Sequence, residues 1–156
     1  MPNYNILSIF QNYIFISAVS AWVAAQIAKV IVNLIKNDGT KINNFLFGTG
    51  GMPSSHSAVV CALCTAAIFR YGFNSFEFAI AGVLAVIVIR DATGVRFEAG
   101  QQAKFLNQMI EQSAENELPD KDAKFKELLG HTPLQVFFGS LLGVCIAALY
   151  GIFWNV

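Results

Sequence analysis

Long apolar runs alternate with short polar segments along this chain. The segments between the runs are rich in Gly, Asn and Asp, and the runs themselves cover residues 7–35, 54–71, 76–89 and 134–154. An α-helix crosses the hydrocarbon core of a bilayer in about 20 apolar residues. The pattern therefore predicts an all-α integral membrane protein, a hairpin-connected bundle of about four transmembrane helices.

A different pattern follows the third apolar run. Ala99, Ala103, Leu106 and Ile110 recur at helical spacing, while Gln and charged residues fill the positions between them. This spacing is typical of an amphipathic helix. We expect it on the cytoplasmic side, along the membrane interface or packed on the bundle, and we expect residues 1–156 to form a single membrane-embedded domain.

Composition supports the membrane assignment. Hydrophobic residues make up 55% of the chain and charged residues only 13%, against roughly 25% charged residues in soluble domains. Acidic and basic residues balance at 10 each, so no general attraction to nucleic acid is expected. The three cysteines lie inside apolar runs and are interpreted as small hydrophobic residues. The sequence therefore indicates no metal and no cofactor.

The basic residues outside the apolar runs are distributed unevenly. Only Arg70 falls on one side of the predicted bundle, and the opposite side holds Lys36, Lys41, Arg90, Arg96, Lys104, Lys121, Lys124 and Lys126. The positive-inside rule places the basic side in the cytoplasm. We expect a protein of the cell (inner or plasma) membrane with its basic, active face in the cytoplasm.

The stretch from Gly50 to Ala58 runs from glycines through Pro53 and hydroxyl residues into an apolar segment. Pro is favoured in the first turn of a helix and Ser at its N-cap, where free N–H groups attract anions. The stretch is consistent with a phosphate site that includes Ser54 and Ser55. The alternative is that it merely starts a membrane helix.

Both histidines of the chain lie on the basic face, each at the start of an apolar run. His56 follows Pro53, and His131 precedes Thr132 and Pro133, which form an N-cap and first-turn pair. Two imidazoles beside cations supply what phosphoryl transfer through a phosphohistidine needs: a nucleophile, a proton donor and groups that bind the phosphate oxygens. Asp91 and Arg96, at the end of the third run, belong to the same face.

Lys29 is a charge inside the first apolar run, and Lys36 follows seven residues later on the same helical face. A charged residue at such a depth usually faces a bundle interior or a polar cavity, which makes Lys29 a functional candidate. The alternative is that its side chain snorkels to the interface.

Three stretches of the chain resemble the divergent type-2 phosphatidic acid phosphatase family, which is related to acid phosphatases and vanadium haloperoxidases. They are Gly50–Ala58, Asp91–Arg96 (Asp-Ala-Thr-Gly-Val-Arg) and Lys126–Val136 (Lys-Glu-Leu-Leu-Gly-His-Thr-Pro-Leu-Gln-Val), the last followed by Gly139. The resemblance covers nearly the whole chain. In this order the motifs are specific for the family rather than for an activity.

The chain departs from the signatures of the broader phosphatase superfamily at several positions. The first signature is Lys, six residues, Arg-Pro, which Lys29 and Lys36 resemble with Lys in place of Arg and without the Pro. The second is Pro-Ser-Gly-His, in which Ser55 replaces the Gly. The third signature of the superfamily is Ser-Arg, five residues, His, three residues, Asp, and His131 matches its histidine. Phe125 occupies the arginine position and Gln135 the aspartate position.

The resemblance implies that His131 is the nucleophile, that His56 protonates the leaving group, and that Lys29 and Lys36 hold phosphate. We infer that Arg96 and Lys126 replace the missing arginine, because both lie on the same face of the bundle and carry a positive charge that suits phosphate oxygens. A carboxylate at position 135 would orient His131, and Gln135 provides only an uncharged acceptor. The alternative is that Gln135 points into the bundle and never meets His131.

The sequence thus predicts a membrane phosphatase that hydrolyses a lipid or isoprenoid phosphate or diphosphate through a phosphohistidine, an activity that Gln135 could weaken. One rival function is a catalytically degenerate carrier or scaffold that binds anionic lipid. A second is a vanadate-dependent oxidant. Because four spans are fewer than the six of the broader superfamily, we also expect a homodimer to complete the walls of the site.

Overall fold

The computed structural model describes residues 5–36, 51–113, 125 and 130–155, and within these ranges the chain is helical and contains no strand. A short 3-10 helix precedes five α-helices. In chain order the elements are η1 (Ile6–Gln11), α1 (Tyr13–Lys36), α3 (Ser55–Tyr71), α4 (Phe76–Thr93), α5 (Val95–Ser113) and α6 (Pro133–Trp154). The predicted all-α architecture is confirmed.

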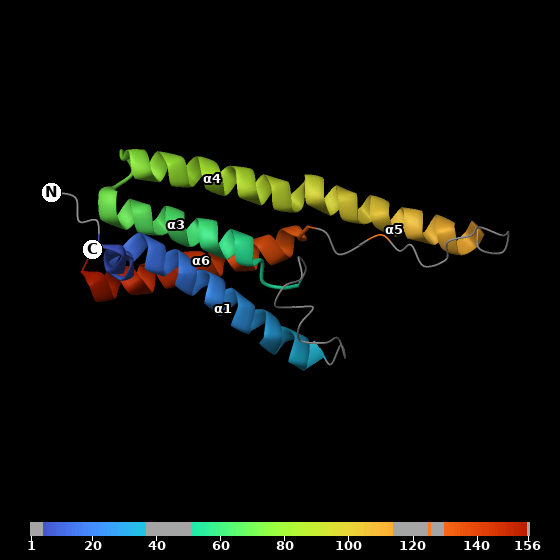
Figure 1. Cartoon of the computed structure of the whole chain (residues 1–156), viewed down its shortest axis with the longest axis horizontal. Coiled ribbons are helices and arrows are strands. Elements are labelled where there is room, and N and C mark those ends of the chain that lie inside the picture. The colour runs from blue at the N-terminus through green and yellow to red at the C-terminus, as the bar shows by residue number, and fades with distance from the viewer. Residues whose placement is uncertain (1–4, 37–50, 114–124, 126–129, 156) are drawn as a thin grey trace.

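Helix α3 lies at the centre of the bundle and packs against α1, α4 and α6 (Figure 1). Its contact surface consists of small residues, since Ala58, Ala62 and Ala66 are fully buried. On α6, a Cβ atom at Gly139 would overlap the carbonyl oxygen of Ser54, and one at Gly143 would overlap that of Ala58. Small residues let membrane helices approach closely, where van der Waals contact replaces the missing hydrophobic drive.

Three helical segments are long and apolar enough to cross a membrane: Tyr13–Ile35, Phe76–Gln112 and Pro133–Trp154. The second predicted span, residues 54–71, forms α3, whose 17 residues make it shorter than the others. Its 17 residues lie at the short end of the about 17–25 with which a helix crosses a bilayer. Large apolar side chains such as Val83, Ile87 and Phe137 are exposed on the outer helices, as expected for a surface that faces lipid.

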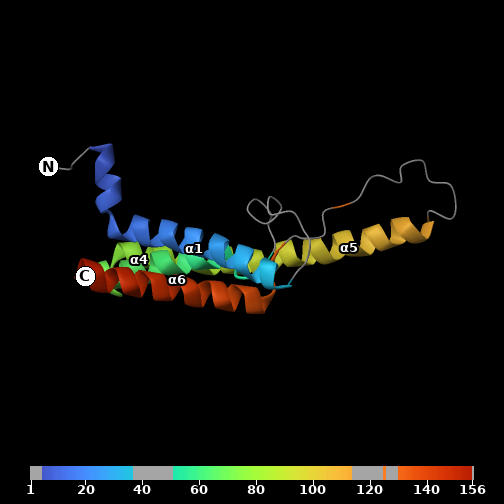
Figure 2. The same ribbon diagram turned by 90° about the horizontal axis from the view of Figure 1, so that it is seen from below.

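The predicted amphipathic helix is α5, and its direction differs from the expectation. It extends beyond the other helices nearly in line with α4, rather than folding back onto the bundle (Figures 1 and 2). The break between the two helices is a single residue, Gly94. Its N–H donates to Arg90 O and its carbonyl accepts from Glu98 N. Because hydrogen bonding continues across the break, the chain has no loop with which to reverse.

Candidate functional site

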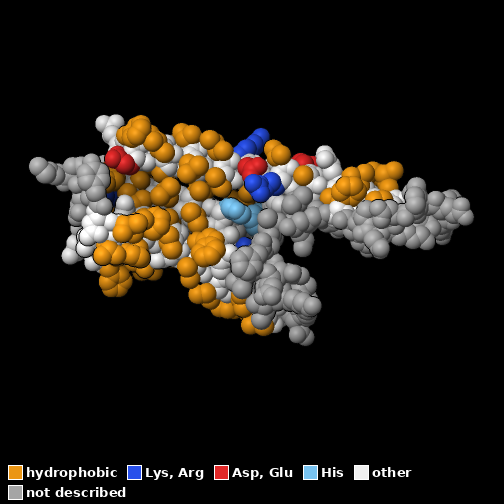
Figure 3. All heavy atoms as spheres, in the orientation of Figure 1, with side chains coloured by type: hydrophobic (Ala, Val, Ile, Leu, Met, Phe, Trp, Pro, Cys, Tyr) orange, Lys and Arg blue, Asp and Glu red, His pale blue; other side chains and the backbone are white. Residues whose placement is uncertain are grey.

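The predicted site residues meet at one end of the bundle, where α3 and α6 begin and α4 ends. A cavity of about 120 Å³ is lined there by His56, Val88, Asp91, Ala92, Arg96, Gly130 and His131. In the space-filling view a histidine side chain surfaces near the middle of the molecule, beside acidic and basic side chains (Figure 3). The structure therefore brings both histidines, Asp91 and Arg96 together around one hollow.

Both helices begin at a hydroxyl N-cap, and Pro133 lies in the first turn of α6 as expected, but Pro53 precedes the N-cap Ser54 and so lies outside α3. The side chain of Ser54 accepts a hydrogen bond from Ser57 N and begins α3, and the side chain of Thr132 accepts one from Gln135 N and begins α6. Ser54 is fully buried, and its own N–H donates to Gln135 O at 3.0 Å. The starts of the two histidine-bearing segments are thus tied to each other through the backbone.

His131 lies immediately before α6 and is only 3% exposed. Its backbone N–H donates to Ala92 O at 2.9 Å, which fixes it against the end of α4. Gly130 precedes it with a φ of 83°, and a Cβ there would overlap the backbone of Phe97. Only glycine fits this conformation and this close approach. The ring of His131 lies 5.9 Å from that of His56, centroid to centroid.

Gln135 meets His131, so the alternative in which it points away is wrong. Its Oε1 lies 3.1 Å from His131 Nδ1 and also accepts the backbone N–H of Thr132 at 3.1 Å. Since a backbone N–H can only donate, it assigns the oxygen of the amide, and not the nitrogen, to this side. Nδ1 of His131 is then the protonated nitrogen. Its Nε2 carries the lone pair and has no hydrogen-bond partner among the described residues.

The electrostatic surroundings favour the neutral form of His131. Burial lowers the pKa of His131 below its usual value, and the nearby positive charges of Lys29 and Arg96 lower it further. The hydrogen bond to Gln135 acts in the opposite direction and raises the pKa. An imidazole kept neutral retains the lone pair that a nucleophile needs.

Lys29 does not snorkel to the interface. It is 3% exposed, and its Nζ donates to the hydroxyl of Ser55 at 3.3 Å. The charge is therefore held inside the bundle, directly behind the first turn of α3. Ser55 is itself 5% exposed, so the pair forms a buried polar contact between α1 and α3.

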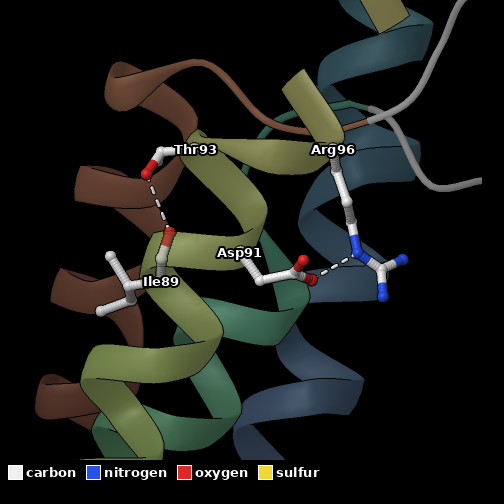
Figure 4. A network of polar contacts seen from close by, with 4 residues as sticks. All are labelled: Ile89, Asp91, Thr93 and Arg96. Atoms are coloured by element: carbon white, nitrogen blue, oxygen red, sulfur yellow. Dashed lines mark hydrogen bonds and ion pairs between the residues drawn. The ribbon is translucent and has the colours of Figure 1, made fainter. Parts of the chain in front are cut away.

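Asp91 and Arg96 form an ion pair on either side of the break at Gly94 (Figure 4). Arg96 Nε donates to Asp91 Oδ2, while the two terminal nitrogens of the guanidinium point away from the carboxylate (Figure 4). A guanidinium that is held through Nε keeps its Nη donors for another acceptor. In this arrangement Asp91 positions Arg96 rather than contacting an anion itself.

The remaining site residues are placed differently or lie outside the described part of the chain. Lys36 is the last residue of α1, and its side chain is outside the described set, as is Lys126. Phe125, in the arginine position, does not line the cavity. Its backbone exchanges two hydrogen bonds of 2.9 Å with the side chain of Asn107 on α5.

Sequence reasoning missed one feature of the site, although a known helix-start motif could have revealed it. Thr132-Pro-Leu-Gln135 is a capping box, in which the side chain of each end residue bonds the backbone N–H of the other. That box is what holds the Gln135 oxygen beside His131.

Comparison with known sequences identifies the family. The sequence pattern of the divergent PAP2 family matches residues 10–146. This chain belongs to the divergent PAP2 family. The membrane protein YuiD of Bacillus subtilis (strain 168) is 37% identical over 162 aligned positions, which cover 95% of this chain and 99% of YuiD. No solved structure matches the chain. Membership of the divergent PAP2 family, together with the apolar helices, makes this a PAP2-related integral membrane protein.

Proposed function

We propose that this protein is a membrane phosphatase that hydrolyses a lipid or isoprenoid phosphate or diphosphate through a phosphohistidine. The observation that carries the proposal is the state of His131. It lines the cavity, Gln135 holds its proton on Nδ1, and its Nε2 lone pair has no partner within the described residues. A buried, oriented and neutral imidazole of this kind is suited to nucleophilic attack.

In the first step Nε2 of His131 attacks phosphorus, so that an N–P bond forms as the bond to the leaving oxygen breaks. His56, across the cavity, gives its proton to that oxygen. In the second step water attacks phosphorus, the N–P bond breaks, and His56 takes the proton of the water. Each step conserves charge and protons within the site.

The cations supply the stabilisation of the transferring group. The Nη donors of Arg96 are suited to binding phosphate oxygens, because a guanidinium presents paired N–H groups in the geometry of a phosphate edge. Lys29 contributes a positive charge from behind Ser55, where burial reduces screening by water. The apolar exterior of the bundle favours a substrate with a lipid or isoprenoid tail.

Phosphate release from a panel of phosphatidate, polyprenyl phosphate and polyprenyl diphosphate, with purified protein in detergent, tests the proposal. We expect release by the wild type and a loss of at least about 100-fold in His131→Ala and in His56→Ala, since each removes a chemical group. Rapid quenching should trap phosphate on His131 in the wild type. Circular dichroism and thermal unfolding establish that the variants fold.

A carrier or scaffold that binds anionic lipid is the second candidate, and Gln135 favours it, because an amide cannot stabilise the imidazolium as a carboxylate does. The same experiment separates the two functions. Tight binding of the lipid phosphates, without release above the His131→Ala level, would exclude the phosphatase and support the carrier.

A further inference from the structure

The opposite end of the bundle contains a second, larger hollow. It measures about 260 Å³ and lies where η1 leads into α1 and where α3 and α6 end. Arg70 of this hollow is 14 residues beyond His56 on α3, which at 1.5 Å per residue places it about 21 Å along the helix. The hollow is therefore separate from the histidine site. The side chains that matter here are Ser8, Gln11, Asn12, Arg70, Tyr71 and Trp154.

Arg70 supplies a positive charge to this hollow. It lies in the last turn of α3, and among the described residues the only ion pair is that of Asp91 with Arg96, at the other end of the bundle. A cation in this place also interacts favourably with the carboxyl end of the helix. That interaction uses the charge but leaves the five N–H donors of the guanidinium available, and these match the oxygens of a phosphate group.

The helices beside the hollow carry exposed apolar side chains. On η1, Ile6 is 83% and Phe10 68% exposed, and near the end of α6, Ile152 is 73% and Phe153 83% exposed. Figure 2 shows η1 standing across the direction of α1, so that it lies along the membrane surface when the bundle spans the bilayer. Such a segment inserts its apolar side chains at the level of the lipid head groups.

Aromatic rings lie in and beside the hollow. The ring of Trp154 lies 6.2 Å from that of Tyr13 and 5.6 Å from that of Tyr150, centroid to centroid. Trp and Tyr are enriched at membrane interfaces, where one end of the ring is apolar and the other is hydrated. The hollow thus combines a cation and amide side chains with exposed apolar and aromatic residues nearby.

We propose that this hollow binds the phosphate group of a membrane phospholipid in the leaflet opposite the histidine site. Arg70 binds the phosphate oxygens, the side chains of Gln11 and Asn12 contact the polar head group, and the acyl chains lie against the exposed apolar residues of η1 and α6. The proposal concerns binding alone and is independent of the proposed phosphatase.

Fluorescence of Trp154 tests this site directly. The chain has two tryptophans, so a Trp22→Phe background leaves Trp154, which lines the hollow, as the reporter. Three probes are titrated into the protein in mild detergent. Phosphatidylglycerol has phosphate and tail, diacylglycerol has the tail alone, and glycerol 3-phosphate has the phosphate alone. We expect saturable changes in Trp154 emission with phosphatidylglycerol and at least tenfold weaker binding of the other two.

Arg70→Gln should weaken phosphatidylglycerol binding by at least tenfold, and Arg70→Lys, which keeps the charge but not the fork, should lose less. Arg90→Gln is the matched control, since Arg90 is also an exposed arginine in the last turn of its helix but lies outside the hollow. It should bind as the parent does. Unchanged binding in folded Arg70→Gln overturns the proposal, as does equal binding of diacylglycerol. If glycerol 3-phosphate binds as tightly as phosphatidylglycerol, the bound phosphate need not belong to a lipid, and the proposed lipid ligand is wrong.

Discussion

Gln135 Oε1 lies 3.1 Å from His131 Nδ1 and accepts the Thr132 N–H at the same time. The amide therefore performs the orienting half of the task that an acidic residue performs in a hydrolase triad. In the proposed mechanism it leaves the other half undone, because an amide carries no charge with which to stabilise an imidazolium at His131.

We predict that Gln135→Glu raises the rate of phosphate release by at least about tenfold, equivalent to about 1.4 kcal/mol of transition-state stabilisation. Glu also serves in a capping box, so α6 should begin as before. Gln135→Leu is the control, and it should lower the rate because it loses the orienting bond. A folded Glu variant with an unchanged or lower rate would show that no carboxylate is missing at this position.

Lys29→Met keeps much of the length and apolar surface of the side chain but deletes the buried charge that contacts Ser55. We predict normal membrane insertion and at least about tenfold weaker binding of vanadate, a phosphate analogue, measured by inhibition or calorimetry. Lys104→Met, on the exposed face of α5, is the matched control. If the Lys29 variant binds vanadate as tightly as the control does, the buried lysine is structural.

The direction in which the pKa of His131 is shifted, below its usual value, can be tested by titration. We predict that the ring stays neutral to below its usual pKa of about 6.5, as read by nuclear magnetic resonance of ¹⁵N-histidine in a His56→Gln background. Lys29→Met should raise the midpoint, because it removes a nearby positive charge. A midpoint at or above 6.5 in the parent background would contradict the placement of His131.

The same shift links pH to stability. Below about pH 6.5 the unfolded imidazole binds the proton more readily than the folded one does. The contribution of His131 is therefore complete above that pH and is lost as the pH falls towards the folded-state pKa. Thermal unfolding should show this acid-side loss in the wild type and a smaller loss in His131→Ala.

Gly139→Ala should destabilise the bundle by about 1–3 kcal/mol, the usual cost of overpacking. The added methyl group would overlap the Ser54 carbonyl and force α6 away from α3. Because Ser54 begins the helix that carries His56, activity should fall as well. Gly82→Ala on α4 is the matched control, since its Cβ would meet no atom closer than 4.0 Å. Equal melting temperatures of the two variants would contradict the close packing.

Much of this architecture follows from the sequence because its causes are local. Apolar runs fix the helices, and Ser54 and Thr132 mark the starts of α3 and α6 through caps that act within one turn. The contact of Gln135 with His131 is also local, at a spacing of four residues. Such features depend on neighbours in the sequence, and a pattern can predict them.

Other features depend on segments far apart in the sequence. The partner of Lys29 is Ser55, 26 residues away on another helix, and no spacing rule predicts that meeting. The direction of α5 depends on the backbone dihedral angles around Gly94, where the helical hydrogen bonds continue from α4 into α5. The hydrophobic pattern does not determine these angles. The assignment of the histidine face to the cytoplasm and the homodimer remain predictions.

Main-chain hydrogen bonds tie the start of α3 to α6 and tie His131 to the end of α4. Ser54 N donates to Gln135 O at 3.0 Å, and His131 N donates to Ala92 O at 2.9 Å. Every non-proline residue carries the same donor and acceptor, so replacing a side chain at these positions leaves the bonds in place. The spacing of the imidazoles is thus uncoupled from the charges around them. A protein with this backbone can exchange arginine for lysine, or a carboxylate for an amide, and so change the charge of the site while the fold stays the same.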